Sequence, residues 1–335
     1  MKIGVLGAGT WGMALASLLV GNGHDVTVWS AIPSEIDELA ENGIHRNLPG
    51  IILPKSINYT KDIECIADKS EMILVVVPSS FVRITAKKLV KHLKDGAILI
   101  TAAKGIESGS LLTMTEIISD VIEKERPELK YQVAALSGPT HAEEVAAGIP
   151  TSIVSACENE EISQRIAEVF ANSCMRVYTN TDVKGVEICG AMKNIIAIAA
   201  GIIAGMGLGD NTKAMLMTRG IAEITRLGVA MGCERRTFMG LAGIGDLIVT
   251  CTSRHSRNNR CGELIGKGMS YEEASREIGM VVEGYHALEA AMQLSQKYDV
   301  TLPITEAVYN VIKGGLSPRD AMHALMTRDL KSELD

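Results

Sequence analysis

The sequence predicts an α/β protein, with a doubly wound parallel sheet in its first half and helices alone in its second half. Two observations lead to this prediction. Short apolar strands alternate with amphipathic helices up to about residue 185, and only helical periodicity follows. The chain also has 335 residues, which is long for a single core and favours two domains. We therefore expect a sheet domain over residues 1–185 and a helical domain over residues 186–335.

The strands expected in the first half are apolar and rich in β-branched residues. The segment Met72–Val77, for example, is aliphatic throughout, as in strands that are buried on both faces of a parallel sheet. Helices that alternate with such strands imply right-handed crossovers. The expected strands are Lys2–Leu6, Asp25–Trp29, Met72–Val77, Ala97–Thr101, Val133–Leu136, Ser152–Ser155 and Arg176–Tyr178, with helices that include Trp11–Val20, Phe81–Leu93 and Ile162–Ala171.

In the second half, the expected helices are Val186–Ala204, Lys213–Met231, Tyr285–Lys297 and Ile304–Lys313. Gly314-Gly315 is typical of a helix end, and Ser317-Pro318 is typical of the next helix start. The apolar run Ile195–Leu208 is shorter than the roughly 20 residues that a membrane span needs. We expect it to be a buried core helix, not a membrane span.

Composition narrows the functional class. Hydrophobic residues make up 47% of the chain and the net charge is −7, which excludes disorder and gives no electrostatic footprint for nucleic acid. Seven widely spaced cysteines without a C-x-x-C motif favour reduced thiols over disulfides or a zinc site, so no metal is expected. The N-terminus leads directly into the first expected strand without a signal peptide, which favours a cytoplasmic protein.

The strongest single motif is Gly7-Ala8-Gly9-Thr10-Trp11-Gly12, a G-x-G-x-x-G. It follows the first expected strand and opens a helix, which is the context that a dinucleotide site of Rossmann type requires. Gly7 would permit the tight turn, Gly9 the approach of a pyrophosphate, and Gly12 close packing of helix and strand. The alternative, a glycine-rich turn without a ligand, is the less favoured interpretation in this context.

The end of the second strand leaves the choice of coenzyme open. An acidic residue there accepts a hydrogen bond from the ribose 2′-OH of NAD, whereas a nearby arginine accommodates the 2′-phosphate of NADP. The sequence reads Ser30-Ala31-Ile32-Pro33 and has neither residue. Ser30 could hydrogen-bond to either form, and Glu35 is expected to cap the following helix. NADH and NADPH therefore both remain candidates.

Two lysines are candidates for chemistry. Lys104 follows the expected strand Ala97–Thr101, at the edge where open α/β sheets bind ligands, although a lone loop lysine is usually only solvated. Lys193 and Asn194 open an apolar helix, where a lysine is costly unless it is paired or functional. Burial would lower its pKa toward the range in which it exchanges a proton with an alcohol, while the alternative is a lysine that extends to solvent from a helix end.

A third segment combines an acid with a cluster of arginines. Asp246 follows the small residues of Gly240–Gly245, so its carboxylate could approach a lysine closely. The guanidinium groups of Arg254, Arg257 and Arg260 match phosphate, and Ser256 and Asn258 add neutral donors. Such a segment is usually a solvated loop. In this acidic protein, however, it is a local cluster of positive charge that could bind an anionic substrate. A hydride reaction needs a proton acceptor, an orienting group and a substrate anchor, and Lys193, Asp246 and the Arg257 segment fit these roles.

These residues carry a resemblance that covers essentially the whole chain. The sequence resembles the NAD(P)-dependent glycerol-3-phosphate dehydrogenases of the bacterial type. The resemblance rests on the ordered set of segments Gly7–Gly12, Ala103–Gly105, Leu136–Glu144, Lys193-Asn194, Gly243–Leu247, Ser256–Asn258 and Val281–Gly284. It implies a Rossmann-type domain with a helical domain, interconversion of glycerol 3-phosphate and dihydroxyacetone phosphate with NADPH or NADH, a homodimer, and a supply of glycerol 3-phosphate for phospholipid synthesis.

The resemblance also implies roles for particular residues. Lys193 would be the proton acceptor with Asp246 beside it, and Lys104 would complete the catalytic group. Substrate contacts would come from Lys104, Gly138, Thr140, Lys193, Asp246, Ser256, Arg257 and Asn258. Coenzyme contacts would come from Gly7, Gly9, Thr10, Trp11, Gly12, Ser30, Lys104, Ala142, Arg257, Val281 and Glu283.

One departure and two rivals accompany the resemblance. Many bacterial relatives carry an arginine or histidine just after the second strand, where this chain has Ala31 and Ile32, so a preference for NADPH is in doubt. The nearest rival is another dehydrogenase with the same two domains, acting on a hydroxy acid or a sugar acid phosphate. A non-catalytic nucleotide sensor is the other, because fold alone does not establish catalysis.

Overall fold

The computed structural model describes residues 1–330 and 332–333, and it divides the chain into two compact units. The first unit contains Met1–Gly190 and Arg236–Asp246, and the second contains Ala191–Arg235 and the described residues from Leu247 onward. The division therefore falls inside one continuous helix, α8 (Val183–Gly205). The segment 236–246, which ends in Asp246, belongs to the first unit although it follows much of the second in sequence.

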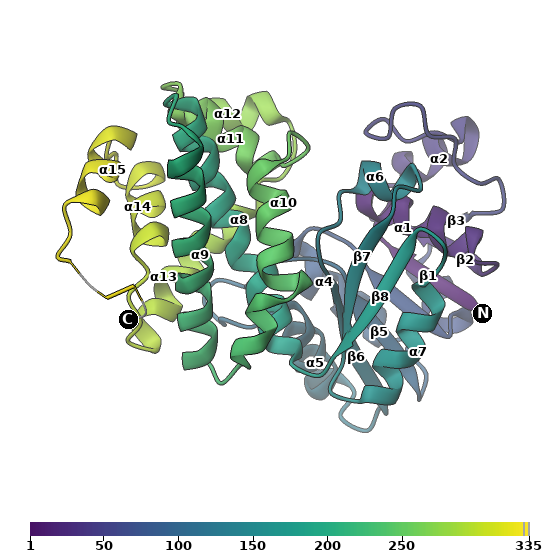
Figure 1. Ribbon diagram of the computed structural model, residues 1–335. Helices are drawn as coiled ribbons and strands as arrows, with labels where there is room; N and C mark the ends of the chain where they lie inside the picture. The colour runs from purple at the N-terminus through teal and green to yellow at the C-terminus, as the bar shows by residue number, and fades with distance from the viewer. Residues whose placement is uncertain (331, 334–335) are drawn as a thin grey trace. The chain divides into compact units, whose positions relative to one another are not determined.

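The first unit is built on an eight-stranded sheet with the strand order β3-β2-β1-β4-β5-β6-β7-β8 (Figure 1). Strand β1 pairs in parallel with β2 and β4, so that Ile3 lies opposite Val26 on one side and Met72 on the other. The strands are β1 (Lys2–Leu6), β2 (Asp25–Trp29), β3 (Asn58–Thr60), β4 (Met72–Val75), β5 (Ala97–Thr101), β6 (Tyr131–Ser137), β7 (Thr151–Ala156) and β8 (Met175–Asn180).

The predicted doubly wound sheet is confirmed as mostly parallel, and among the described strands the one pair that departs from it is β6–β7. Strand β7 pairs antiparallel with β6, and β8 then pairs in parallel with β7. The connection between β6 and β7 contains only the short helix α6 (Ala142–Ala146), which is too short to carry the chain back to the starting edge of the sheet. The next strand therefore begins at the edge where β6 ends and runs in the opposite direction.

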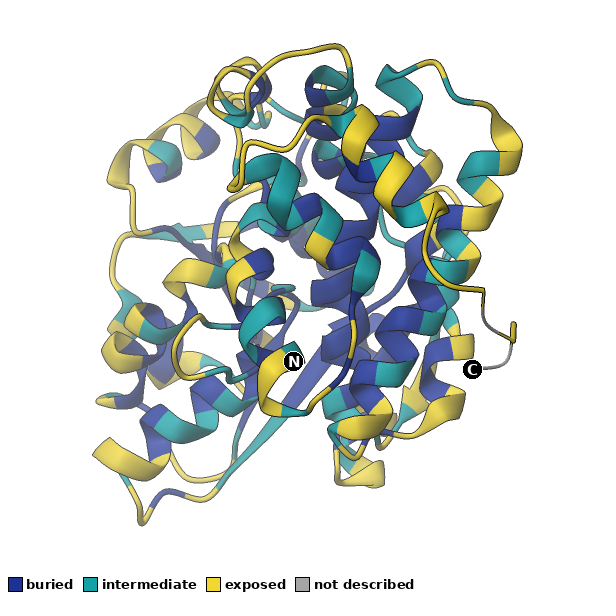
Figure 2. Cartoon of the chain, turned by 90° about the vertical axis from the view of Figure 1, so that its left-hand side faces the viewer, coloured by how far each residue is buried: buried dark blue, intermediate teal, exposed yellow. Residues whose placement is uncertain are grey.

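Two hydrophobic clusters cover the two faces of the sheet. Alternate strand residues point to opposite faces, so Ile3 and Val5 lie in one cluster and Leu6 lies in the other. Helices α1 (Thr10–Gly21), α2 (Pro33–Asn42), α6 and α7 (Glu160–Phe170) pack on one face, and α3 (Ile63–Lys69), α4 (Val82–Val90) and α5 (Met114–Glu125) pack on the other. Figure 2 shows the buried residues along the strands and on the inner faces of the helices.

The second unit contains helices and no strand among its described residues, as predicted. The predicted start at Ser317-Pro318 is also right, because the Ser317 hydroxyl accepts from the Asp320 N–H and caps the last helix. In addition to the C-terminal part of α8, its helices are α9 (Asp210–Ala230), α10 (Asp246–Thr252), α11 (Arg257–Gly266), α12 (Tyr271–Ile278), α13 (Glu283–Lys297), α14 (Pro303–Ile312) and α15 (Pro318–Met326). Asp246, the first residue of α10, itself belongs to the first unit.

Helix α8 approaches α11 at backbone distance because glycines lie on both sides of the contact. A Cβ atom on Gly201 would lie 2.0 Å from the Asn259 carbonyl oxygen, and one on Gly262 would lie 2.0 Å from the Ile198 carbonyl oxygen.

The described part of the chain holds one helix long and apolar enough to cross a membrane, which is α8, but 89% of its most apolar window is buried. It is a core helix, as expected for the run Ile195–Leu208.

Candidate active site

The glycine-rich turn between β1 and α1 has the geometry of a dinucleotide-binding loop. Gly7 has a φ of 122°, which favours glycine, and a Cβ atom on Gly12 would lie 2.0 Å from the Gly7 carbonyl oxygen. No atom lies within 4 Å of a Cβ built on Gly9, so the turn is open at that point. The buried Thr10 hydroxyl has no hydrogen-bond partner among the described residues. The turn therefore fits a pyrophosphate, with the N-terminus of α1 and the Thr10 hydroxyl as donors.

Glu35 does not cap the helix after β2, contrary to the expectation from the sequence. Glu35 lies in the first turn of α2, but its carboxylate does not cap that helix; it accepts a hydrogen bond from the Ser30 hydroxyl at 2.6 Å. The Ser30 oxygen in turn accepts from the Ile32 N–H at 3.1 Å. The structure therefore places an acidic side chain at the end of β2, where the residues immediately after the strand provide none.

Lys104 and Asp246 form a partly buried ion pair within the first unit. Lys104 follows β5, and its Nζ atom lies 2.7 Å from Asp246 Oδ2 and 3.1 Å from the Gly138 carbonyl oxygen. The Asp246 side chain is only 1% exposed and that of Lys104 is 18% exposed. Asp246 is positioned by a single π-helical turn over Leu241–Gly245, whose Gly243 could not carry a Cβ because it would lie 2.1 Å from the Phe238 carbonyl oxygen. The expected close approach of Asp246 to a lysine is thus present, with Lys104 as the partner.

The segment after β6 surrounds the Lys104 ammonium. The Gly138 carbonyl accepts from Lys104 and also from the Thr140 hydroxyl, which lies 3.2 Å away. Ser137, the last residue of β6, has a buried hydroxyl without a hydrogen-bond partner among the described residues. A Cβ on Gly190 would lie 3.3 Å from both Ser137 Oγ and Lys104 Cγ, so these side chains meet at the same point of α8. The Lys104–Asp246 ion pair and the Ser137 hydroxyl together provide polar groups that could bind a ligand.

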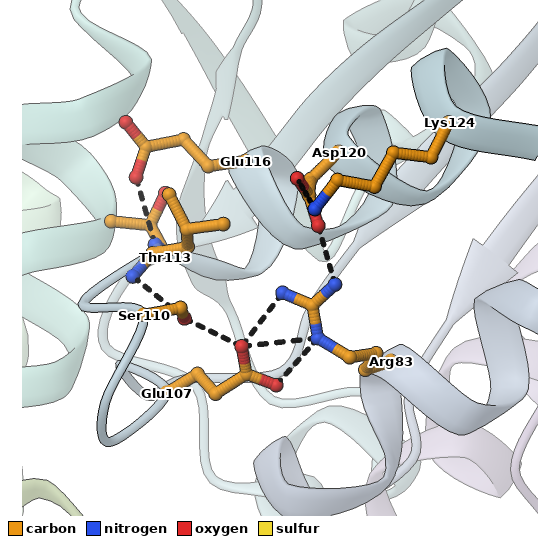
Figure 3. A network of polar contacts seen from close by, with 8 residues as sticks. Arg83, Glu107, Ser110, Thr113, Glu116, Asp120 and Lys124 are labelled. Carbon is orange, nitrogen blue, oxygen red and sulfur yellow. Dashed lines mark hydrogen bonds and ion pairs between the residues drawn. The ribbon is translucent and has the colours of Figure 1, made fainter.

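The loop that carries Lys104 is held by a network that sequence reasoning missed (Figure 3). Arg83 on α4 makes a bidentate contact to Glu107 in this loop, with Nε 2.8 Å from Oε1 and Nη2 2.7 Å from Oε2, and a further contact to Asp120 on α5 at 2.5 Å. Ser110 donates to Glu107 at 2.5 Å. Arg83 is 24 residues from Glu107 and 37 residues from Asp120, so no local sequence pattern identifies these contacts.

Lys193 is buried in the second unit, where it makes a short hydrogen bond. It is 6% exposed, and its Nζ atom donates to the Thr250 hydroxyl on α10 at 2.6 Å. The alternative of a lysine that extends to solvent is therefore wrong. Burial and this hydrogen bond fix the position of the Lys193 ammonium within the second unit.

Asn258 ties three helices of the second unit together. Its Nδ2 atom donates to Asn194 Oδ1 at 2.9 Å, and its Oδ1 atom accepts from the Gly284 N–H at 2.9 Å. It thereby links the residue after Lys193 on α8 to α11 and to the first turn of α13. Much of the hydrogen-bonding capacity of Asn258 serves this connection.

The arginine-rich segment is a helix start instead of the solvated loop that such a composition usually forms. The Ser256 hydroxyl accepts from the Asn259 N–H at 3.2 Å and caps α11, which Arg257 opens. Arg257 is half-buried, whereas Arg254 and Arg260 are exposed. The remaining coenzyme candidates lie at two other helix starts, with Ala142 opening α6 in the first unit and Val281 and Glu283 preceding and opening α13 in the second.

Comparison with known proteins identifies the family. The model described as the N-terminus of NAD-dependent glycerol-3-phosphate dehydrogenase matches residues 2–163, and the model for its C-terminus matches residues 182–323. The chain belongs to this family. It is a glycerol-3-phosphate dehydrogenase that uses NAD(P) as coenzyme and interconverts glycerol 3-phosphate and dihydroxyacetone phosphate.

Individual glycerol-3-phosphate dehydrogenases match over the full length. Glycerol-3-phosphate dehydrogenase (NAD(P)+) 2 of Lactobacillus delbrueckii subsp. bulgaricus is 54% identical over 99% of both chains, and the enzyme of Agathobacter rectalis is 47% identical over 99% of this chain and 97% of its own. The crystal structure of the Coxiella burnetii enzyme superposes with a TM-score of 0.92 at 35% identity, covering 98% of this chain and 99% of that one. D-mandelate dehydrogenase, at 15% identity and a TM-score of 0.60, shares the fold alone.

Proposed function

We propose that Lys193 is the acid–base group of the glycerol-3-phosphate dehydrogenase reaction. The observation that carries this proposal is a buried lysine whose Nζ atom donates a short hydrogen bond to the Thr250 hydroxyl. In the reductive direction Lys193 would donate a proton to the carbonyl oxygen of dihydroxyacetone phosphate, and in the oxidative direction it would accept the hydroxyl proton of glycerol 3-phosphate. The coenzyme would supply the hydride to the carbonyl carbon of dihydroxyacetone phosphate, or take it up from the corresponding carbon of glycerol 3-phosphate.

Lys104 and Asp246 would act as an orienting pair. Their ion pair is partly buried and the Lys104 ammonium also donates to the Gly138 carbonyl, so the ammonium has a fixed direction. A fixed cation of this kind stabilises an oxygen that gains negative charge during the reaction. Gly138 and Thr140 would complete the substrate contacts on this side, since the Thr140 hydroxyl lies next to the same carbonyl.

The N-terminus of α11 would bind the substrate phosphate. Arg257 opens this helix and contributes a guanidinium fork, while Ser256 and Asn258 flank it. For the coenzyme we propose Gly7, Gly9, Thr10, Trp11, Gly12, Ser30, Lys104, Ala142, Arg257, Val281 and Glu283 as contacts. The open position at Gly9 and the unused Thr10 hydroxyl support the first part of this set.

Three further properties belong to the same proposal. The dinucleotide-binding domain would cover residues 1–185 and the helical substrate-binding domain residues 186–335. The enzyme would be a cytoplasmic homodimer, which sedimentation of the purified protein would test. Its product would supply the glycerol phosphate backbone of phospholipids, consistent with the reaction of its family.

The decisive experiment follows absorbance at about 340 nm, the band of the reduced nicotinamide, with purified protein and dihydroxyacetone phosphate. We expect oxidation of the coenzyme by the wild type, and loss of most turnover in Lys193→Ala with coenzyme binding retained. Full turnover in Lys193→Ala would remove this residue from its role. Turnover of 3-hydroxyisobutyrate or 6-phosphogluconate in place of dihydroxyacetone phosphate would favour the rival dehydrogenase, and coenzyme binding without any turnover would favour the sensor.

A further inference from the structure

An acidic side chain is fixed at the carboxyl end of β2. Ser30 follows this strand directly and is buried, and its hydroxyl donates to Glu35 at 2.6 Å while accepting from the Ile32 N–H at 3.1 Å. Both hydrogen bonds constrain the serine, so the half-buried carboxylate of Glu35 is held in one place. Glu35 comes from the first turn of α2, several residues beyond the point where a sequence pattern places the coenzyme discriminator.

The glycine-rich turn and this carboxylate are connected through His45. The turn begins beside the end of β2, where the Gly7 N–H donates to the Trp29 carbonyl at 2.8 Å. The His45 Nδ1 atom accepts from the Asn47 N–H at 3.1 Å, which leaves Nε2 as the donor toward the Ala8 backbone in the middle of the turn. Glu35 lies close enough to this imidazole to act on its charge. The Glu35 carboxylate therefore lies near the glycine-rich turn, on the side of His45.

The other charged groups in this neighbourhood leave little positive charge for a 2′-phosphate. Burial and the neighbouring Arg46 lower the pKa of His45 below its usual value, which disfavours the charged imidazole beside the turn. The Lys61 ammonium is paired with Asp37 at 2.6 Å. The Arg46 side chain is exposed, and it is the group that would compete for a phosphate.

We propose that Ser30 and Glu35 form the ribose-recognition pair of this dehydrogenase and make it prefer NADH to NADPH. The Glu35 carboxylate would accept a hydrogen bond from the ribose 2′-OH and would repel a 2′-phosphate, while Ser30 keeps it in position. This inference rests on the proposed coenzyme site at the glycine-rich turn. It adds a residue, Glu35, to that site and selects one of two coenzymes.

The test measures coenzyme binding without substrate. The chain has two tryptophans, Trp11 in the glycine-rich turn and Trp29 at the end of β2, so energy transfer from tryptophan to the reduced nicotinamide reports binding of NADH and NADPH. We expect the wild type to bind NADH about tenfold more tightly, and Glu35→Gln to reduce this ratio about tenfold. Ser30→Ala should change the ratio in the same direction by a smaller factor. The matched control is Glu38→Gln, which removes the same charge from an exposed position of the same helix and should leave the ratio unchanged.

Two results would overturn the inference. One is a ratio that Glu35→Gln leaves unchanged or that Glu38→Gln changes equally. The other is tighter NADPH binding that Arg46→Ala abolishes, which would make Arg46 the 2′-phosphate anchor. Failure of the proposed function can be told apart from failure of this inference. In that case the ratio of NADH to NADPH affinity would still depend on Glu35, but dihydroxyacetone phosphate would not be reduced. If neither coenzyme changed the tryptophan emission, the coenzyme site and this inference would both fail.

Discussion

Replacement of Glu187 by glutamine should remove a large pH dependence of stability. Glu187 lies on α8 within the first unit and is buried, and its carboxylate accepts from the Thr115 N–H at 2.9 Å and from the Thr115 hydroxyl at 2.5 Å. It thereby satisfies donors in the first turn of α5. Burial raises the pKa of Glu187 from 4.5 to about 7, and the hydrogen bonds from Thr115 oppose this rise only in part.

The magnitude follows from the two pKa values. Because the folded protein holds the Glu187 proton more tightly than the unfolded chain does, the stabilisation is fully present below about pH 4.5 and is lost as pH rises through about 7. A difference of about 2.5 pKa units corresponds to about 3 kcal/mol of unfolding free energy. Glutamine does not titrate and keeps one acceptor, so Glu187→Gln should lose about 1 kcal/mol at low pH and gain stability relative to the wild type near pH 8.

Urea denaturation of both proteins between about pH 5 and about pH 8 measures this difference. Other groups also titrate, so the informative quantity is the free energy of unfolding of the variant minus that of the wild type at each pH. Glu38→Gln, which alters an exposed glutamate, controls for the change in net charge. A difference that stays constant across the range would refute the raised pKa of Glu187.

Three further predictions concern the coenzyme turn, the Lys104 loop and the helix contact. Gly12→Ala should abolish coenzyme binding in the tryptophan assay because its Cβ would lie 2.0 Å from a backbone oxygen, and unchanged affinity would contradict the proposed geometry of the turn. Glu107→Gln should weaken the anchor of the loop that carries Lys104 and lower kcat about tenfold, with a smaller loss of coenzyme affinity because Lys104 is only one of the proposed coenzyme contacts; equal losses in both would indicate a general structural defect instead. Gly201→Ala should lower the free energy of unfolding by about 1–3 kcal/mol in urea, since its Cβ would meet the Asn259 carbonyl at 2.0 Å, and a neutral effect would argue against backbone contact of the two helices.

Long apolar segments made most of the fold predictable from the sequence. The expected strands Lys2–Leu6, Asp25–Trp29 and Ala97–Thr101 have the observed bounds, because each is a β-branched or apolar run that ends at small or polar residues. The expected strand Met72–Val77 continues two residues beyond β4, since Val76 and Val77 are apolar but lead into Pro78. Apolar character alone does not mark where the pairing ends.

Short or polar elements were not predictable in the same way. Strand β3 contains only Asn58, Tyr59 and Thr60, and it forms at the sheet edge through pairing with β2. The reversal of β7 depends on the length of its connection, which periodicity does not report. In both cases tertiary pairing decides the structure, and the local sequence carries no signal for it.

Some residues of the candidate site were also predictable from the sequence and others were not. Lys104, Lys193 and Asp246 could be found because charged residues are conspicuous within apolar or glycine-rich segments. The structure buries Lys193 and Asp246 and places Lys104 at a partly buried position beside Asp246. The partners that position them were not found. Thr250 and the Arg83–Glu107 pair become visible only when distant segments are brought together.

The glycine-mediated packing of α8 has a consequence for synthesis of the chain. Helix α8 ends at Gly205, but its backbone is met by residues of α11 and α13, of which Gly284 is added about 80 residues later. At about 5–20 residues per second, a ribosome needs roughly 4–16 s to add these roughly 80 residues. During that interval the C-terminal part of this apolar helix lacks its native neighbours on α11 and α13. Early packing of α9 against α8 would protect this segment from aggregation until the C-terminal helices arrive.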